Sequence, residues 1–569
     1  MKKLEARHAP KIVTDLRQMI RTGAEQFGDK DIYVYKENKV EKHLSYKENY
    51  ERVLWFGTAL SKLGLMGAHI AVIGETHPSY MTTFFSAITG GGVIVPLDKD
   101  LQDSEIINFS VISEVKAIVY TSAFNKRIPS FKDSLPEVKY FIPILPEEGD
   151  PTGDNIISFD SMLEMGKEAL EAGDRSFADY NADIEQLGAI LFTSGTTGTS
   201  KGVMLSHRNF VAATNASCLS MEYDERNVFV DCLPMHHSYE ITCGQLAIQN
   251  LGATLCINDS LKNVLRNFAN YRPNALMLVP LFVETMYKKI WSEIDKKGMR
   301  KKVRTAIKIS NALLKCGIDV RDKFFGQITG AFGGRLNSIV CGGAPISPQL
   351  IKDFNAFGIF VLEGYGITEC SPLVAVNSPG KERFHSVGQP VKGCQVKIDH
   401  KGDTKDGIPV GEILVKGCNV MMGYYKNEEA TKEVFTDDGW FRTGDIGYMD
   451  KDNYIYITGR KKNVIILSNG KNIFPEELEE YLSGCDIIDE SVVIGREHEN
   501  GEIVITAVVY PNQELIKGMT KEQVEAAVKE AVNEINKQHP IYKQIRDVEV
   551  RDTEFEKTTS KKIKRYKVK

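Results

Sequence analysis

The sequence predicts an α/β protein whose sheets are largely parallel, followed by a smaller α+β unit. Short apolar runs alternate with segments of helical pattern from about residue 69 to residue 366. Runs without polar alternation are typical of strands buried on both faces, as in parallel sheets that helices cover. Beyond about residue 400, charged turns separate the strand-like segments, which favours antiparallel pairing.

The apolar runs give the expected strands in order along the chain. A helical segment at 79–92 lies between the first two. We expect strands near 69–74, 93–98, 116–122, 140–145, 189–195, 228–234, 253–258, 275–280, 338–345 and 359–366.

The last stretch, roughly 460–569, is predicted to form a small α+β domain. Its helix at 520–538 has apolar residues spaced i, i+4, i+8 and i+11, which puts them on one face. These residues are Val524, Val528, Val532 and Ile535. We expect an N-terminal domain at 1–458, a hinge at 459–463 and a C-terminal domain at 464–569.

Composition argues against several classes of protein. Lys and Arg number 71 and Asp and Glu 76, a net charge of −5, so the chain as a whole does not attract nucleic acid. The ten cysteines have no metal-ligand spacing, which favours a reducing cytosol over disulfides or structural zinc. We expect a cytoplasmic protein, because the first 20 residues lack the apolar region of a secretory signal and no apolar stretch is long enough for a membrane helix.

A local basic segment, KKGMRKKVR at 296–304, departs from this balance. With the residues that follow, it could form a helix that has Val303, Ile307 and Leu314 near one face and lysines on the other. Such a helix could make a peripheral contact with a membrane surface. A charged helix packed on its own domain is the commoner arrangement, and we favour it.

The most informative stretch is ILFTSGTTGTSKGVMLSH at 190–207, between a predicted strand and a helix predicted to begin near His207. Its glycines, hydroxyls and Lys201 suit phosphate oxygens. It is not a Walker A loop, because Ser200 and Gly202 stand where Gly and Ser or Thr are required. A flexible linker is disfavoured, because linkers are not normally bounded by a buried strand and a helix.

This loop resembles the signature loop of the adenylate-forming superfamily, which includes acyl-CoA synthetases, adenylation domains of peptide synthetases, and luciferases. Further segments resemble the motifs of this superfamily, in the same order and across nearly the whole chain. They are LPMHHSYE (233–240), CGGAPI (341–346), YGITE (365–369), FRTGD (441–445), TGRKKN (458–463) and FEKTTSKKIKR (555–565). The first and last of these are most similar to the long-chain fatty acyl-CoA synthetase forms.

The resemblance implies a large N-terminal domain of α/β layers plus a distorted β-barrel, with a small mobile C-terminal lid. It also implies an activity in two steps. A fatty acid, of long chain in the branch it resembles, would attack the α-phosphorus of ATP to give acyl-adenylate and pyrophosphate, and coenzyme A would then displace AMP. Mg²⁺ would accompany ATP. Transfer to an acyl carrier protein, or use of a shorter or aromatic acid, is the alternative.

Two rivals come from other classes. A nucleotide-hydrolysing switch would release orthophosphate, and the failed Walker A pattern counts against it. A binding module without turnover would have no need for Glu369, Asp445, Arg460 and Lys562 together.

The resemblance implies roles for individual residues. The phosphates would be held by Thr193, Ser194, Gly195, Thr196, Thr197, Gly198 and Lys201. Thr193 and Glu369 would hold Mg²⁺. The adenine side would be formed by Gly342, Gly343, Ala344 and Tyr365, with Gly366 and Thr368 in the same motif. Asp445 would accept both ribose hydroxyls, and Arg460 would reach the ribose or a phosphate.

Other roles concern the acyl group and the lid. His237 would lie beside the acyl-adenylate, whereas His236 has the alternative of a core histidine and Cys370 that of a buried thiol. Lys462 would be the hinge residue, and Gly470 would lie on the face used in thioester formation. Ile465-Ile466-Leu467 stands where relatives often have Ile-Lys, so that lysine contact is not carried over, although Lys471 could substitute.

The basic C-terminal run contains the expected catalytic lysine. Its ammonium would bridge the attacking carboxylate and the α-phosphate. Lys561 and Lys562 are adjacent, so the assignment is open by one position. The spacing to Ile563 and Arg565 favours Lys562.

Overall fold

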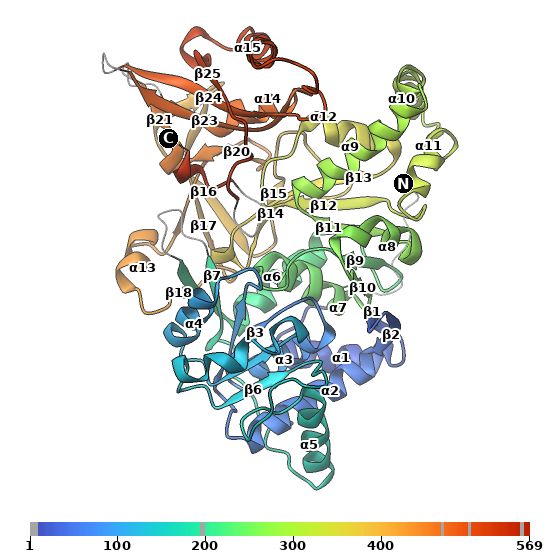
Figure 1. Cartoon of the computed structure of the whole chain (residues 1–569), viewed down its shortest axis with the longest axis vertical. Helices are drawn as coiled ribbons and strands as arrows, with labels where there is room; N and C mark the ends of the chain where they lie inside the picture. The colour runs from blue at the N-terminus through green and yellow to red at the C-terminus, as the bar shows by residue number, and fades with distance from the viewer. Residues whose placement is uncertain (1–9, 194–199, 468–471, 499–501, 558–562, 569) are drawn as a thin grey trace.

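The computed structural model describes residues 10–193, 200–467, 472–498, 502–557 and 563–568. Two large sheets with helices and one four-stranded sheet form the N-terminal part of the chain. A smaller α+β unit at the C-terminus, orange to red in Figure 1, lies over one end of this part. This arrangement confirms the predicted α/β class with a large N-terminal and a small C-terminal domain.

The first large sheet has nine strands in the order β15-β14-β13-β12-β11-β9-β10-β1-β2. Neighbours from β13 through β1 pair in parallel, and antiparallel strands complete both edges. The strands are β1 (Asp31–Glu37), β2 (Val40–Ser45), β9 (Val228–Asp231), β10 (Thr254–Ile257), β11 (Ala275–Leu278), β12 (Ser338–Gly342), β13 (Phe360–Gly366), β14 (Leu373–Val376) and β15 (Gln389–Pro390).

The second large sheet has seven strands in the order β18-β8-β7-β4-β3-β5-β6. Strands β7, β4, β3, β5 and β6 run parallel, whereas β8 and β18 are antiparallel additions. Their bounds are β3 (His69–Ile73), β4 (Val93–Leu97), β5 (Ala117–Tyr120), β6 (Tyr140–Pro143), β7 (Leu187–Thr193), β8 (Lys201–Ser206) and β18 (Gly423–Tyr424). Strands β4 and β5 are buried along their whole length, which explains their unbroken apolar sequences.

Several helices of the N-terminal part begin at polar caps or prolines that the sequence supplies. Ser45 and Glu48 form a reciprocal capping box at the start of α2, and Ser206 and Asn209 do the same for α6. The helices are α1 (Leu16–Phe27), α2 (Tyr46–Lys62), α3 (Pro78–Thr89), α4 (Asp103–Ile112), α5 (Phe159–Glu171), α6 (His207–Ser220), α7 (Ala247–Leu251), α8 (Val264–Tyr271), α9 (Pro280–Lys296), α10 (Arg300–Lys315), α11 (Arg321–Gly330) and α12 (Pro348–Phe357).

A four-stranded antiparallel sheet follows, in the order β16-β17-β19-β20. It stands where the resemblance implied a distorted β-barrel, and within the described residues its strands pair as an open sheet. Its elements are β16 (Cys394–Lys405), β17 (Ile408–Gly417), β19 (Phe441–Met449) and β20 (Ile455–Arg460), with α13 (Glu428–Val434) before β19.

The C-terminal unit packs two helices on a three-stranded sheet in the order β23-β24-β25. The predicted apolar stripe of α15, Val524 to Ile535, is buried in the core of this unit, which confirms the predicted helix and its face. The elements are β21 (Ile465–Ile466), β22 (Asn472–Ile473), α14 (Pro475–Ser483), β23 (Ile488–Glu497), β24 (Ile503–Pro511), α15 (Lys521–Asn536) and β25 (Asp547–Val550).

Each of the ten predicted apolar strands forms, from β3 through β13. Other strands of the two large sheets were not predicted, among them β1, β2, β14 and β15. A further unpredicted strand, β8, lies before α6, so the segment after β7 leads to an antiparallel strand instead of directly to a helix. Val203 and Leu205 of β8 are buried, and their pairing with β7 adds an edge to the sheet. In the part of the chain that the structure describes, no helix combines the length and apolar character required to cross a bilayer.

Candidate functional site

A cavity of about 3350 Å³ lies at the carboxyl ends of β7, β9, β12 and β13 and extends to the C-terminal unit. This is where open α/β sheets bind ligands, because the strand ends and their loops meet there. Every predicted site residue that the structure describes lines this cavity. They are Thr193, Lys201, His237, Gly342, Gly343, Ala344, Tyr365, Gly366, Thr368, Glu369, Asp445, Arg460 and Lys462.

Seven predicted residues lie outside the described residues: Ser194, Gly195, Thr196, Thr197, Gly198, Gly470 and Lys562. Lys471 and Lys561 lie outside them as well. The residues on either side of the first group, Thr193 and Ser200, line the cavity. Lys557 and Ile563, which form a β-bridge across residues 558–562, also line it.

Asp445 is in contact with two other predicted site residues. One oxygen accepts a 2.6 Å hydrogen bond from the Tyr365 hydroxyl, and the other lies 2.7 Å from Nε of Arg460. Asp445 and Arg460 are register partners on β19 and β20, so strand pairing fixes their contact. These two contacts hold the Asp445 carboxylate in one orientation at the cavity wall.

Tyr365 is buried at the end of β13, and burial raises the pKa of its phenol well above the usual value, with the Asp445 charge adding to the effect. Gly342 on β12 is the register partner of Gly364, and Gly343 has a φ of +92°. A Cβ on Gly366 would lie 2.4 Å from the carbonyl oxygen of Pro372. Glycine is therefore required where the chain turns at Gly343 and where β13 meets β14 at Gly366.

Tyr424 connects two predicted residues and was missed by sequence reasoning. Its hydroxyl donates a 3.0 Å hydrogen bond to Oε1 of Glu369, and Nζ of Lys201 lies 4.8 Å from its ring centroid. Tyr424 is nearly buried and lines the cavity. Burial raises the pKa of its phenol, and the Glu369 charge adds to this rise, so the hydroxyl remains a donor. The only signal in the sequence was an aromatic pair after glycine in MMGYY.

Thr193 and Glu369 both face this part of the cavity and offer oxygen ligands. Oε1 of Glu369 accepts the hydrogen bond from Tyr424, and a carboxylate has acceptor positions on both oxygens. Mg²⁺ takes few protein oxygens and completes its shell with phosphates and water, so these two residues fit such an ion. Among the described residues, no group of three or more His, Cys, Asp or Glu side chains is arranged to hold a metal.

His236 and His237 pack against each other at one wall of the cavity, with ring centroids 4.1 Å apart and the rings tilted by 50°. Burial lowers the pKa of His236 to about 4, so its ring is neutral near pH 7, although Nε2 lies 3.3 Å from Oδ2 of Asp98. Cys370 is fully buried, and burial raises the pKa of its thiol well above the usual value. Cys370 is thus a buried thiol, as expected.

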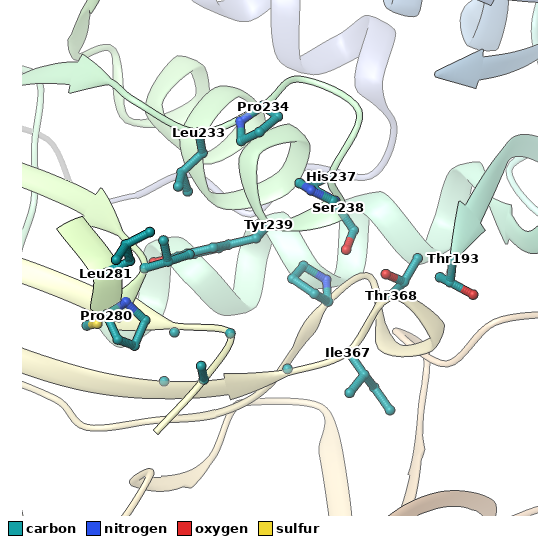
Figure 2. A pocket seen from close by; sticks show the side chains of 18 of the residues that line it. Thr193, Leu233, Pro234, His237, Ser238, Tyr239, Pro280, Leu281, Ile367 and Thr368 are labelled. Atoms are coloured by element: carbon teal, nitrogen blue, oxygen red, sulfur yellow. The ribbon is translucent and has the colours of Figure 1, made fainter. Parts of the chain in front are cut away.

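One end of the cavity is polar and the other is apolar. Figure 2 shows Thr193 and Thr368 toward one end of the pocket and Tyr239, Pro280 and Leu281 toward the other. The hydroxyl of Tyr239 donates to the carbonyl oxygen of Val340, so its ring forms part of the apolar wall. Further apolar residues of the lining are Met221, Leu233, Ile257, Met277, Val279 and Phe282.

The C-terminal unit closes the polar side of the cavity. Lys462, in the turn after β20, has a pKa lowered to about 8 by burial and by the charges of Arg460 and Arg565. Arg565 donates to the carbonyl oxygen of Val493 at 2.7 Å and pairs with Glu479 of α14. Arg565 is thereby anchored within the C-terminal unit, three residues after the predicted lysine.

Comparison with known proteins agrees with this geometry. The chain matches a family model described as AMP-binding enzyme over residues 20–425 and one described as AMP-binding enzyme C-terminal domain over 462–569. A solved anthranilate CoA ligase, AuaEII, in complex with anthranoyl-AMP has a similar fold, with a TM-score of 0.77 at 18% identity over 98% of this chain and 97% of that one.

Two relatives from Arabidopsis thaliana are similar in sequence. Long chain acyl-CoA synthetase 7, peroxisomal, is 30% identical over 67% of this chain and 56% of its own length. The chloroplastic long-chain-fatty-acid–(acyl-carrier-protein) ligase AEE15 is 27% identical over 90% of this chain and 78% of its own. Because the first family model covers more than half of the residues, the chain belongs to the AMP-binding enzyme family.

Proposed function

We propose that this protein is an AMP-forming acid–thiol ligase that activates a long-chain fatty acid with ATP and transfers the acyl group to coenzyme A. The observation that carries the proposal is one cavity with a polar end, lined by the nucleotide-motif residues, and an apolar end suited to an acyl chain. The long-chain acyl-CoA synthetase among its relatives supports this substrate class.

In this proposal the nucleotide lies along the residues at the strand ends. Tyr365 contacts the adenine. Gly342 and Gly343 have no side chain and Ala344 has only a methyl group, which allows the base to approach the backbone closely. Asp445 accepts the ribose hydroxyls, supported by the 2.6 Å contact with Tyr365, and Arg460 lies beside it to reach the ribose or a phosphate. Gly366 and Thr368 continue the same wall.

In the proposal the phosphates of the nucleotide lie on the side of the cavity away from these adenine and ribose contacts. Lys201 and the loop residues Ser194, Gly195, Thr196, Thr197 and Gly198 hold the β- and γ-phosphates in the proposal. Thr193 and Glu369 hold Mg²⁺, which when bound supplies positive charge to the phosphate oxygens. Tyr424 orients the Glu369 carboxylate through its hydrogen bond.

The chemistry has two steps in one site. A carboxylate oxygen bonds to the α-phosphorus while pyrophosphate leaves, with Lys562 neutralising the charge between the two anions. The thiol of coenzyme A then adds to the acyl carbon and AMP leaves, with His237 beside the acyl-adenylate. The steps place opposite demands on water access, so we assign 464–569 as a lid that rotates about 459–463, with Lys462 as the hinge and Gly470 on the thioester face.

Coenzyme A is the proposed acceptor, and an acyl carrier protein is the second candidate. The relative AEE15, a long-chain-fatty-acid–(acyl-carrier-protein) ligase, favours the second candidate and covers more of this chain. The partners are in either case fatty acid, ATP and a thiol, and the balanced overall charge argues against nucleic acid. We propose that the protein is cytoplasmic and makes a peripheral contact with a membrane surface.

The experiment is a panel of carboxylic acids from acetate to oleate, each with ATP, Mg²⁺ and either coenzyme A or a carrier protein. Release of AMP and pyrophosphate is expected with long-chain acids, and thioester is expected with coenzyme A. Release of orthophosphate in place of AMP would point to the nucleotide-hydrolysing class. No AMP with any acid would refute the proposal.

A further inference from the structure

Helices α9, α10 and α11 form a projection beside the nine-stranded sheet, at the right of Figure 1. The segment 296–325, from the end of α9 into α11, contains ten Lys or Arg residues and two Asp residues. The whole chain has a net charge of −5. This projection is therefore strongly basic on a protein that is slightly acidic overall.

Part of this charge is used to hold the projection together. Arg304 pairs with Asp353 of α12 at 2.8 Å, and its guanidinium lies 4.1 Å from the ring centroid of Trp291 on α9. Arg300 pairs with Asp295 at the end of α9. Six exposed lysines have no ion-pair partner among the described residues: Lys297, Lys301, Lys302, Lys308, Lys315 and Lys323.

Three of these lysines are aligned on α10. Lys301, Lys308 and Lys315 are spaced by seven residues, about two helical turns, so they share one face. The opposite face carries Ile307 and Ser310, which are buried, and α10 packs on α9, α11 and α12. The lysine face is therefore turned away from the protein.

Apolar side chains accompany the lysines on this exterior. Ile309, next to Lys308, is 47% exposed. Ile318, in the turn between α10 and α11, is 53% exposed, and Phe324, on α11, is 42% exposed. We call the set Lys301, Lys308, Lys315, Ile309, Ile318 and Phe324 the α10–α11 surface.

We propose that the α10–α11 surface docks the protein on a membrane that contains anionic lipid. Lysines near such a membrane are attracted by its negative surface potential. Exposed Ile and Phe side chains then enter the boundary between headgroups and acyl chains. A membrane accepts scattered apolar side chains without a shaped pocket, whereas a protein partner needs a complementary surface. The lysines and the apolar residues together thus favour lipid.

Helix α9 links the proposed membrane contact to the cavity. Its first turn, Pro280 to Phe282, lines the apolar end of the cavity, and its last turn leads directly to the basic projection. One helix thus connects the docking surface with the cavity wall. The proposal does not depend on the proposed function, because vesicle binding is measured without any substrate.

The test is flotation of the full-length protein with vesicles of phosphatidylcholine alone and of phosphatidylcholine mixed with phosphatidylglycerol. Binding is expected only to the anionic vesicles and should weaken as salt is raised. Lys301→Glu/Lys308→Glu/Lys315→Glu should weaken this binding by at least about 100-fold, because each lysine contributes about a factor of five. Ile318→Ser/Phe324→Ser leaves the charge unchanged and should also weaken it.

A matched control reverses the charge at three exposed lysines in the C-terminal unit. Lys517→Glu/Lys521→Glu/Lys529→Glu, on α15 and just before it, changes the net charge equally, and this variant should bind as the unaltered protein does. Circular dichroism verifies that each variant is folded. Equal binding to both vesicle types, equal loss in the control, or retained binding by the α10 variant would each overturn the proposal. Binding of an acidic carrier protein to this surface without vesicle binding would also overturn it and assign another occupant.

Discussion

The hydroxyl of Tyr365 donates a 2.6 Å hydrogen bond to the carboxylate of Asp445, and this contact joins β13 of the nine-stranded sheet to β19 of the four-stranded sheet. Both residues are buried, so the bond is formed where water competes little. The orientation of the proposed ribose acceptor is therefore set by the strand that also carries the proposed adenine contact.

Tyr365→Phe removes this hydrogen bond and keeps the ring. We expect the KM for ATP to rise about 10-fold, because a hydrogen bond to a charged group contributes roughly 1.5–3 kcal/mol. Steady-state kinetics at varied ATP measure the change. Tyr454→Phe is the matched control, since it removes a 2.6 Å bond to the Lys381 carbonyl oxygen from a similarly buried tyrosine. An unchanged KM in Tyr365→Phe would show that this contact does not orient Asp445.

Tyr424→Phe removes the donor to Glu369 and keeps the ring near Lys201. We expect the Mg²⁺ concentration needed for half-maximal AMP formation to rise about 10-fold, because the Glu369 carboxylate loses the partner that orients it. A titration with Mg²⁺ at saturating ATP measures it. Tyr425→Phe is the control, because it breaks a 2.6 Å bond to exposed Glu114 one residue away. Equal effects of both changes would assign Tyr424 a structural role only.

Lys562→Ala is expected to reduce acyl-adenylate formation by at least about 100-fold, because the approach of two anions loses its point charge. Thioester formation from preformed acyl-AMP should change far less. The two half-reactions, assayed separately, measure the split. Lys561→Ala serves as the neighbour control. Loss only in Lys561→Ala would move the assignment by one residue, and equal loss of both half-reactions would contradict the proposed role.

Glu363→Gln tests the electrostatics of the cavity wall. Burial raises the pKa of Glu363 from 4.5 to about 8, with Glu480 contributing. Between these pH values the folded protein binds a proton that the unfolded chain has released, so Glu363 lowers stability as pH rises through this window. The Gln variant should therefore gain in Tm relative to the parent more at pH 8 than at pH 5. Glu530→Gln, at an exposed position, is the control. Its change in Tm relative to the parent should be the same at both pH values.

The strands and the order of the motifs could be predicted because the signals are local. Apolar runs such as AIVY of β5 have no other use than burial, and all ten predicted runs formed strands. Strand β8 was missed because KGVMLS is short and follows a loop rich in Gly, Ser and Thr. Its identity depends on pairing with β7 and β18, which composition does not encode.

The residues of the candidate site were likewise predictable only in part. Residues within motifs, such as Asp445 and Glu369, could be named from sequence, and the structure brings them to one cavity. Tyr424 could not, because its contact with Glu369, 55 positions away in sequence, depends on β18 joining the edge of the sheet. The lowered pKa of Lys462 likewise results from burial beside Arg460 and Arg565. Arg565 is distant in sequence and lies near Lys462 only in the folded chain.

The β7–β8 hairpin has a consequence for engineering. Thr193 and Lys201 are register partners across the two strands, so backbone hydrogen bonds hold both ends of the glycine-rich segment. If this segment binds the phosphates as proposed, exchanging residues between Thr193 and Lys201 should change phosphate binding while the two strand residues and the apolar end of the cavity keep their positions.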